Sequence, residues 1–262
     1  MNRRTQSAFK ILGVVLALAN ASVAAGDEQA SLTWTTGMEF SSGKYGGAEV
    51  IEDLYVPITA RLDYQRFTFE LTVPYLSVRA PSGSTITEPG GEPVAGSGEL
   101  STESGLGDVI AGVTVYDVFY SDDLGVALDV TGKIKFGTAD EVKGLGTGGQ
   151  DYTVRADLFK FYEHFTLLGS AGYKFRGDTA DLDLEDVFIG SLGGVYTLNE
   201  KRRFGLMYDY RESALIDGDA ISELSAFTAS RINDSLQIQF YAFTGFSDSS
   251  ADWGAGFLLQ IL

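Results

Sequence analysis

The feature that most constrains this chain is a period-two alternation of apolar and polar residues, which is clearest in residues 104–140. In residues 126–136 every even position holds an apolar residue or glycine, whereas charged residues such as Lys133 occupy odd positions. A polar turn at 121–123 separates this segment from residues 108–116, which alternate in the same way. Alternation on both arms of a short-turn hairpin is typical of two antiparallel strands, each with one apolar and one polar face.

The same pattern recurs from Leu32 to the end of the chain. It predicts an all-β fold of about twelve strands, connected as an antiparallel up-and-down meander, in which residues 223–231 are the least regular. A tilted strand needs roughly 9–11 residues to cross a bilayer, and most of the alternating segments approach this length. The expected strands are residues 32–40, 54–63, 66–75, 108–116, 126–136, 152–158, 167–176, 188–198, 203–211, 223–231, 236–242 and 253–261.

The connections between these segments fall into two classes that alternate along the chain. The short turns are expected near Gln65, Asp122, Glu163, Glu200 and Asn233. The long loops, rich in glycine or acidic residues, are expected at 42–49, 80–104, 137–149, 177–185, 212–219 and 247–252. This sorting is typical of a transmembrane β-barrel of the bacterial outer membrane, whose short turns face the periplasm. A soluble β-sandwich, the alternative, has no physical reason to sort its loops.

The N-terminal residues have the pattern of an export signal. Arg3 and Arg4 precede an apolar run at 11–19, and small residues place a cleavage site after Ala24 or Ala25. An apolar run this short does not span a bilayer, so the pattern predicts a secretory signal peptide at residues 1–25. The barrel would then comprise residues 26–262 and lie in the outer membrane of a Gram-negative bacterium.

Composition excludes several classes of function. The formal net charge is −17, whereas nucleic-acid binding needs a basic surface, so nucleic acid is excluded as a partner. The single histidine, His164, falls in an expected periplasmic turn, which argues against a serine–histidine hydrolase at the outer rim. With one histidine and no cysteine, transition-metal sites are also disfavoured. We therefore expect no enzymatic activity and no cofactor.

The polar face of the strands carries charges of both signs, and in a membrane barrel this face lines the lumen. One interpretation is a network of cross-strand ion pairs that nearly fills a small barrel. The other is a narrow charged channel that orients a polar solute. Unpaired burial of such groups is costly, so most must be paired or hydrated. The candidate lumen-lining residues are Glu39, Arg61, Glu70, Asp108, Asp129, Lys133, Lys135, Arg155, Asp157, Lys174, Arg176, Arg203, Asp209 and Arg211.

The long loops concentrate acidic residues, which predicts a solvated acidic rim at the outer face that favours cations. Within this rim, residues 181–186 could supply hard oxygen ligands to divalent cations through Asp181, Asp183, Glu185 and Asp186. No glycine-containing twelve-residue calcium loop is present, so the solvated rim is the favoured interpretation. The acidic residues expected at the rim are Glu88, Glu92, Glu99, Glu103, Asp140, Glu141, Asp178, Asp181, Asp183, Glu185, Asp186, Asp217, Asp219, Asp248 and Asp252.

Two prolines interrupt the strand pattern. Pro57 and Pro74 fall on adjacent expected strands, at similar distances from the turn at Gln65. Because proline cannot donate to a β-ladder, each predicts a bulge or a position without a ladder hydrogen bond.

Five short motifs carry a resemblance to a known family. They are Tyr55-Val56-Pro57, Val73-Pro74-Tyr75, Gly105-Leu106-Gly107-Asp108-Val109, Lys135-Phe136-Gly137-Thr138-Ala139-Asp140 and Gly146-Thr147-Gly148-Gly149-Gln150-Asp151-Tyr152. In this order they resemble the bacterial outer-membrane family named after the meta-pathway of phenol degradation. Its members are described as channels for aromatic or other hydrophobic compounds, so the resemblance implies a barrel and transport. This chain has Gly137 where the family has proline, and Leu262 in place of a terminal aromatic residue.

Together these observations predict an outer-membrane channel or facilitated transporter for small molecules, and the resemblance implies aromatic or hydrophobic solutes. The partners would be outer-membrane lipid and the solute, with divalent cations at the acidic loops as a further alternative. The competing hypothesis is a non-conducting structural barrel that displays its acidic loops.

Overall fold

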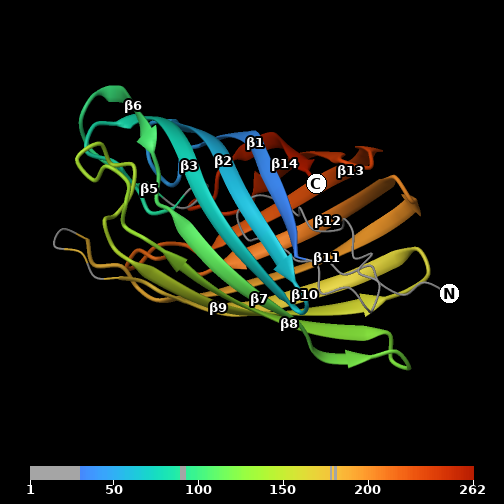
Figure 1. Ribbon diagram of the computed structural model, residues 1–262. Helices are drawn as coiled ribbons and strands as arrows, with labels where there is room; N and C mark the ends of the chain where they lie inside the picture. Colours follow the sequence, from blue (N-terminus) through green and yellow to red (C-terminus); the bar gives the residue numbers. More distant parts are fainter. Residues whose placement is uncertain (1–29, 89–92, 178, 180–181) are drawn as a thin grey trace.

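The computed structural model describes residues 30–88, 93–177, 179 and 182–262. Within them, twelve strands form a closed antiparallel barrel (Figure 1). The barrel strands are β1 (Ser31–Gly43), β2 (Ile51–Tyr64), β3 (Phe67–Pro81), β7 (Ile110–Ser121), β8 (Val126–Lys135), β9 (Asp151–Phe161), β10 (Phe165–Phe175), β11 (Val187–Asn199), β12 (Arg202–Arg211), β13 (Ile221–Asn233), β14 (Leu236–Gly245) and β15 (Trp253–Ile261). The predicted all-β barrel of about twelve strands is confirmed. The predicted signal peptide lies outside the described residues.

The barrel closes because its first and last strands pair. β1 runs antiparallel to β15, from Trp34 opposite Ile261 to Ser42 opposite Trp253. Every other barrel strand pairs with its neighbours along the chain, so the topology is an up-and-down meander. Closure satisfies the backbone groups that an open edge would leave unpaired. In the part of the chain that the structure describes, no helix is long and apolar enough to cross a membrane.

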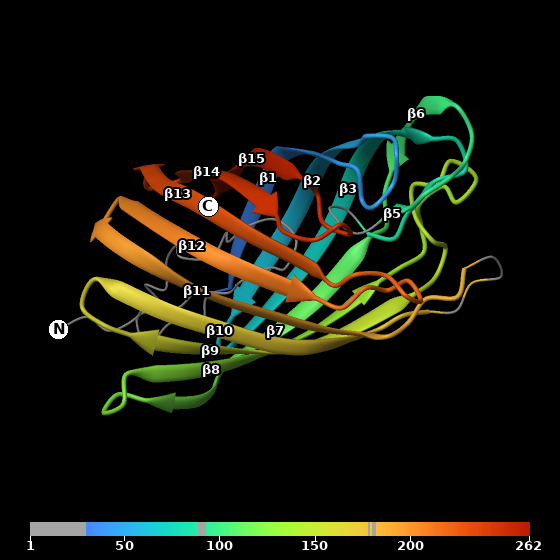
Figure 2. The ribbon, with the colours of Figure 1, turned by 180° about the vertical axis from the view of Figure 1, so that it is seen from behind.

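The connections are sorted by length between the two ends of the barrel. The short turns lie where they were predicted, for example between Tyr64 and Phe67 and between Asn199 and Arg202. The described chain also begins and ends on this side, since Ser31 pairs with Asp63 beside the β2–β3 turn. We call this side the short-turn end. The long loops gather at the opposite, long-loop end, where β6 is also found (Figures 1 and 2).

Three short strands lie in the longest connection, between β3 and β7. β4 (Thr85–Ile86) and β5 (Pro93–Val94) form a two-stranded hairpin. β6 (Leu100–Leu106) extends the sheet by pairing with residues 75–81 of β3, toward the long-loop end. β7 pairs with residues 67–72 of β3, toward the short-turn end. β6 and β7 therefore act as two segments of one barrel strand, interrupted at residues 107–109.

The outward face of the barrel is apolar, as the alternation predicted. Large apolar side chains are exposed on strands all around the wall, among them Trp34, Ile58, Phe69, Leu71, Val154, Leu158, Leu192, Leu206 and Phe240. An exposed apolar band of this extent is unfavourable in water and is typical of a surface that contacts lipid.

The two prolines face each other without a bulge between their strands. Pro57 pairs with Pro74 in a continuous β2–β3 register, so of the two predicted alternatives the structure shows a position without a ladder hydrogen bond and no bulge between these strands. The ladders on the other side of each proline are interrupted instead. β1 and β2 pair up to Thr36–Ile58 and resume at Glu39–Tyr55, and β3 changes partner from β7 to β6 around Pro74. The missing proline N–H groups thus point to the sides where pairing stops.

The barrel interior contains an apolar layer in addition to charged groups. Inward-facing side chains on β8–β15 pack together toward the short-turn end, and the alternation did not predict this. We call this set the apolar layer: Ala127, Phe159, Leu168, Val195, Met207, Phe227, Tyr241 and Leu258, with Phe161 and Phe243 packed against it. Glycines in the wall make room for it. A Cβ at Gly205 would lie 2.2 Å from the Phe227 ring, and one at Gly193 would lie 2.2 Å from Met207 Sδ. Small residues opposite large ones allow a narrow barrel to be filled.

Candidate functional site

The candidate lumen residues from the sequence all lie on the inward side of the wall, buried or half-buried. Twelve belong to barrel strands. Asp108 lies in the interruption between β6 and β7, and Arg176 directly follows β10. Several of these residues converge at the long-loop half of the barrel, on β8, β10 and β12, where Asp151 on β9 joins them. This convergence is the candidate site.

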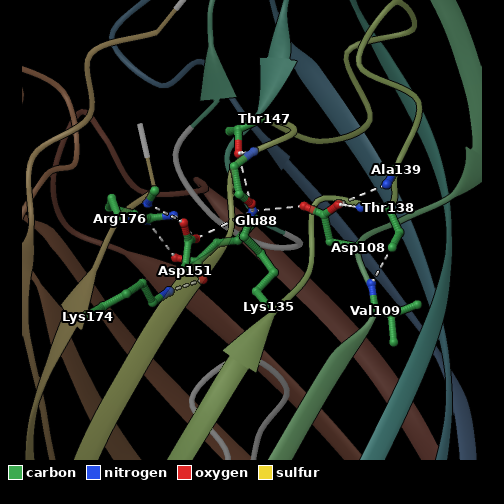
Figure 3. A network of polar contacts seen from close by, with 12 residues as sticks. Glu88, Asp108, Val109, Lys135, Thr138, Ala139, Thr147, Asp151, Lys174 and Arg176 are labelled. Carbon is green, nitrogen blue, oxygen red and sulfur yellow. Dashed lines mark hydrogen bonds and ion pairs between the residues drawn. The ribbon is translucent and has the colours of Figure 1, made fainter. Parts of the chain in front are cut away.

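Lys135, at the last position of β8, is the centre of the first half of the site (Figure 3). Its Nζ atom lies 2.9 Å from Asp108 Oδ2 and 3.4 Å from Asp151 Oδ2. It also donates to Thr147 Oγ1 and to the carbonyl of Gly149, both at 3.2 Å. All three charged side chains are at most 7% exposed. Lys135 therefore neutralises two buried carboxylates, each of which would be costly if left unpaired.

Asp108 ties this pair to the backbone of a long loop. Its Oδ1 atom accepts hydrogen bonds from the N–H groups of Thr138 and Ala139, each at 2.9 Å. Val109 N–H donates to Thr138 Oγ1 at 2.9 Å (Figure 3). The loop after β8 is thus fixed to the interruption between β6 and β7 by charge-assisted hydrogen bonds.

Glu88 is the centre of the second half of the site. It lies in the loop after β4, and three cations from the barrel wall converge on its carboxylate: Lys174, Arg176 and Arg211. Arg176 Nη2 is 3.2 Å and Arg211 Nη1 is 2.5 Å from Glu88 Oε1. The Glu88 side chain is 11% exposed, so its predicted place in a solvated acidic rim is wrong. Of the other rim acids in the described residues, Glu103 is half-buried on β6. The rest lie in loops and are exposed: Glu99, Asp140, Glu141, Asp183, Glu185, Asp186, Asp217, Asp219, Asp248 and Asp252.

Arg176 connects the two halves. Its Nη1 atom donates to Asp151 Oδ2 at 3.1 Å, and Asp151 is also the partner of Lys135. Ion pairs therefore run without interruption from Asp108 through Lys135, Asp151 and Arg176 to Glu88 (Figure 3). This chain of contacts spans the wall from β7 to β10.

The loop that carries Glu88 is held in place by backbone and apolar contacts. Ile86, 4% exposed, packs into an apolar cluster with residues such as Leu76 and Leu145. Its N–H donates to the carbonyl of Gly144 at 2.9 Å. Gly144 has φ = +68°, and a Cβ at this position would lie 1.9 Å from the carbonyl oxygen of Ser84. Only glycine allows this approach, so Gly144 helps to set the position of Glu88.

The electrostatic environment keeps Glu88 ionised. Burial alone would raise the pKa of this carboxyl, but the opposing charges of Lys174, Arg211 and Arg176 hold its pKa well below its ordinary value of 4.5. At neutral pH the site therefore contains a carboxylate clamped by three cations.

A cavity of about 90 Å³ adjoins both halves of the site. Glu88, Lys174, Lys135 and Asp151 contribute to its charged lining. Tyr55, Ile110 and Ile189 line it as well, as do Thr131 and Thr153. The cavity has room for several water molecules or for part of a small organic solute.

The remaining candidate residues form smaller groups on the inner wall, and Arg155 among them also lines the cavity. Arg61 pairs with Asp63 at 2.9 Å and donates to Tyr116 Oη at 2.8 Å, near the short-turn end of β2. Arg155 pairs with Asp157 at 2.9 Å along β9. Glu39 accepts a hydrogen bond from Tyr241 Oη at 2.5 Å.

Asp129 has a local partner, because it accepts the N–H of Asp117 at 2.9 Å, where the β7–β8 register shifts. Glu70 and Lys133 line the cavity. Arg203 and Asp209 face inward on β12, and neither makes one of the ion pairs described above.

Sequence reasoning missed two members of the site. Asp151 begins β9, and its position at a strand start gave no sign that it would pair with both Lys135 and Arg176. Glu88 lies in a glycine-rich loop, 86 and 123 residues from its partners Lys174 and Arg211. Contacts over such separations leave no local pattern.

The suggested divalent-cation ligands do not form a site in the described residues. Asp181 lies outside them, while Asp183, Glu185 and Asp186 are exposed. No group of three or more acidic or histidine side chains in the described part of the chain is arranged to hold a metal ion. His164 lies in the turn between β9 and β10, with its side chain 63% exposed.

Comparison with solved structures finds barrels of the same kind. The crystal structure of the COG4313 outer membrane channel from Pseudomonas putida F1 superposes with a TM-score of 0.72 at 13% identity, covering 92% of this chain and 99% of that one. The fold is that of an outer-membrane β-barrel. The KdgM porin superposes with a TM-score of 0.55 at 7% identity, covering 88% of this chain and 98% of that one. No protein-family model matches the sequence, and neither does any curated protein.

Proposed function

We propose that this protein is a channel of the bacterial outer membrane that lets small molecules, including aromatic or hydrophobic compounds, diffuse through its lumen. The observation that carries the proposal is a closed barrel with an apolar outer band and a charged inner wall that borders a cavity. A purely structural barrel needs no cavity lined by paired charges. Similarity of fold to an outer-membrane channel and to a porin supports the same function.

The solute class follows from the two kinds of surface inside the barrel. The candidate lumen-lining residues supply charged groups at the long-loop half, and the apolar layer supplies aromatic rings toward the short-turn end. A solute that has both a polar group and an apolar body would contact each surface in turn. This agrees with the aromatic compounds implied by the family resemblance. In this proposal the barrel is not an enzyme, and its partners are outer-membrane lipid and the diffusing solute.

A second candidate function is a non-conducting barrel that displays its acidic loops. The observation in its favour is the filling of the interior by the ion network and the apolar layer. A barrel plugged in this way would be rigid and stable but would pass no solute.

Conductance separates the two functions. Residues 26–262, refolded into detergent, should give discrete current steps in planar lipid bilayers if the barrel is a channel. Correct folding is verified beforehand by the shift in gel mobility that a boiled barrel shows. Folded protein that produces no steps, and no swelling of liposomes in small sugars or aromatic acids, supports the structural barrel and contradicts the channel.

A further inference from the structure

The strongest unexplained feature of the site is the cluster of Lys174, Arg176 and Arg211 around a single carboxylate that comes from a loop. We infer that this cluster is a binding site for the carboxylate of an organic acid, which Glu88 occupies in the resting protein. The inference rests on the proposed channel function and names its solutes as small organic acids with an apolar body. Glu88 would then be a tethered competitor that a solute displaces on its way through.

Charge balance shows why the site would attract an anion once Glu88 leaves. The ion-paired network contains four cations, Lys135, Lys174, Arg176 and Arg211, and three anions, Glu88, Asp108 and Asp151. Without Glu88 the four buried cations would face two carboxylates. Buried cations without partners are costly, so an anion from solution is the natural replacement.

The geometry of Arg176 indicates that the tethered carboxylate does not use the whole site. Its side chain is 2% exposed, Nη1 binds Asp151, and Nη2 contacts Glu88. Its Nε atom is buried without a hydrogen-bond partner among the described residues. A guanidinium binds carboxylates best through two parallel hydrogen bonds, and Nε with Nη2 forms such an edge. A carboxylate that is free to rotate could use both donors, whereas Glu88 is restrained by its loop.

The adjoining cavity fits the remainder of such a solute. Glu88 and Lys174 line it, and Ile110, Ile189 and Tyr55 supply apolar parts of the same lining. An acid whose carboxylate lies among the three cations could therefore place its apolar body against these side chains. A bare inorganic anion would gain nothing from them.

Calorimetry on folded barrel in detergent tests the inference, with benzoate as the probe and benzamide as its uncharged analogue. Glu88→Gln removes the competing charge and keeps the shape of the side chain. If Glu88 leaves the site open about a tenth of the time, the apparent Kd of benzoate should fall about tenfold in Glu88→Gln relative to wild type. Benzamide should not bind either protein. Glu49→Gln, which removes an exposed acid from the β1–β2 loop, should bind benzoate like wild type.

A second variant assigns the binding to the cluster. Arg176→Gln added to Glu88→Gln should abolish benzoate binding. If the variants do not fold, hydrogen exchange on the wild-type barrel tests the inference instead. Benzoate should speed backbone exchange at residues 84–88 because it displaces Glu88. Equal benzoate affinity in wild type and Glu88→Gln, or no effect on this exchange, would overturn the inference.

The outcome is separable from that of the proposed function. Benzoate binding to a barrel that shows no conductance supports the carboxylate site and contradicts the channel. Conductance without any benzoate binding keeps the channel and overturns the site. In a conducting barrel, Glu88→Gln should also shift the reversal potential toward anion selectivity, and Glu49→Gln should shift it less.

Discussion

The two halves of the barrel interior are held together by different forces. At the long-loop half, charged groups from four strands and three connecting segments pair with one another around Lys135 and Glu88. Toward the short-turn end, the same wall carries the apolar layer, which contains Phe159 and Phe227. Ion pairs need specific partners in specific positions, whereas apolar packing is non-directional and depends on area and volume. The charged half can therefore select a solute, and the apolar half mainly limits the width of the barrel.

The largest effect, a loss of unfolding free energy, is expected from replacing Lys135, the centre of the charged half. Lys135→Ala would leave Asp108 and Asp151, each 3% exposed, without their shared cation. Breaking a buried ion pair on one side costs about 3–5 kcal/mol. Urea unfolding followed by tryptophan fluorescence should show a loss of this size. Lys44→Ala, at an exposed loop lysine, should cost less than about 0.5 kcal/mol. Similar losses in the two variants would show that the network does not stabilise the barrel.

A somewhat smaller loss is expected from the apolar half. Phe159 is 2% exposed and packs in the apolar layer, so Phe159→Ala should cost about 3 kcal/mol of unfolding free energy. Phe240→Ala removes an outward ring that is 53% exposed and should cost less. The Phe159 variant should also raise single-channel conductance, because it widens the inner path, and the Phe240 variant should not. Unchanged conductance in Phe159→Ala would place the limiting constriction in the charged half instead.

The sequence predicted those features of the fold that follow from the two-residue repeat of a β-strand. Successive side chains on a strand point to opposite faces, so alternation was enough to assign Lys133 and Lys135 to the inner face and to predict the barrel. The lengths of the connections were enough to assign the short turns to one end of the barrel and the long loops to the other. These features depend only on neighbouring residues, and the structure confirms the strands and turns.

The features that were not predicted include the apolar layer and the position of Glu88. The apolar layer lies where both faces of a strand are apolar, as at Leu158 and Phe159, and there the alternation is blurred. Consecutive apolar residues next to a short turn, which place apolar side chains on both faces of a strand, could have predicted this layer. Glu88 gave no comparable signal, because its burial depends on Ile86 packing in a distant cluster and on cations 86 or more residues away.

A smaller effect, on ion selectivity, is expected from displacing residues 84–88 through a substitution at Gly144. Gly144→Ala would place a Cβ 1.9 Å from the Ser84 carbonyl at a φ of +68°, and the left-handed backbone alone costs alanine about 1–2 kcal/mol. Hydrogen exchange at residues 84–88 should become faster, and the selectivity should approach that of Glu88→Gln. Gly132→Ala, where a Cβ would have nothing within 4 Å, is the matched control. If Gly144→Ala shifts selectivity further in a Glu88→Gln background, the glycine acts by a route other than Glu88.

The smallest effect is expected from a change of pH, which should alter ion selectivity and loop exchange. The direction of this change follows from the lowered pKa of Glu88. The docked carboxyl has a pKa well below the ordinary value of 4.5 because Lys174, Arg211 and Arg176 outweigh the effect of burial. A group whose pKa is lowered on docking stabilises the docked state above its ordinary pKa. That contribution is lost as the pH falls through the lowered value.

The difference in ion selectivity between wild type and Glu88→Gln, and the exchange of the loop in wild type, should therefore stay constant from about pH 7 to about pH 5. Below pH 4.5 this difference should begin to shrink, because the carboxyl of Glu88 gains a proton whereas the amide of Glu88→Gln does not titrate, and the other acidic groups are common to both proteins. Reversal potentials measured in a salt gradient at each pH give the comparison. A transition between pH 5 and 7 in wild type that is absent in Glu88→Gln would mean that Glu88 is not clamped by the three cations, and the charged half would then lose its role as the selective part of the barrel.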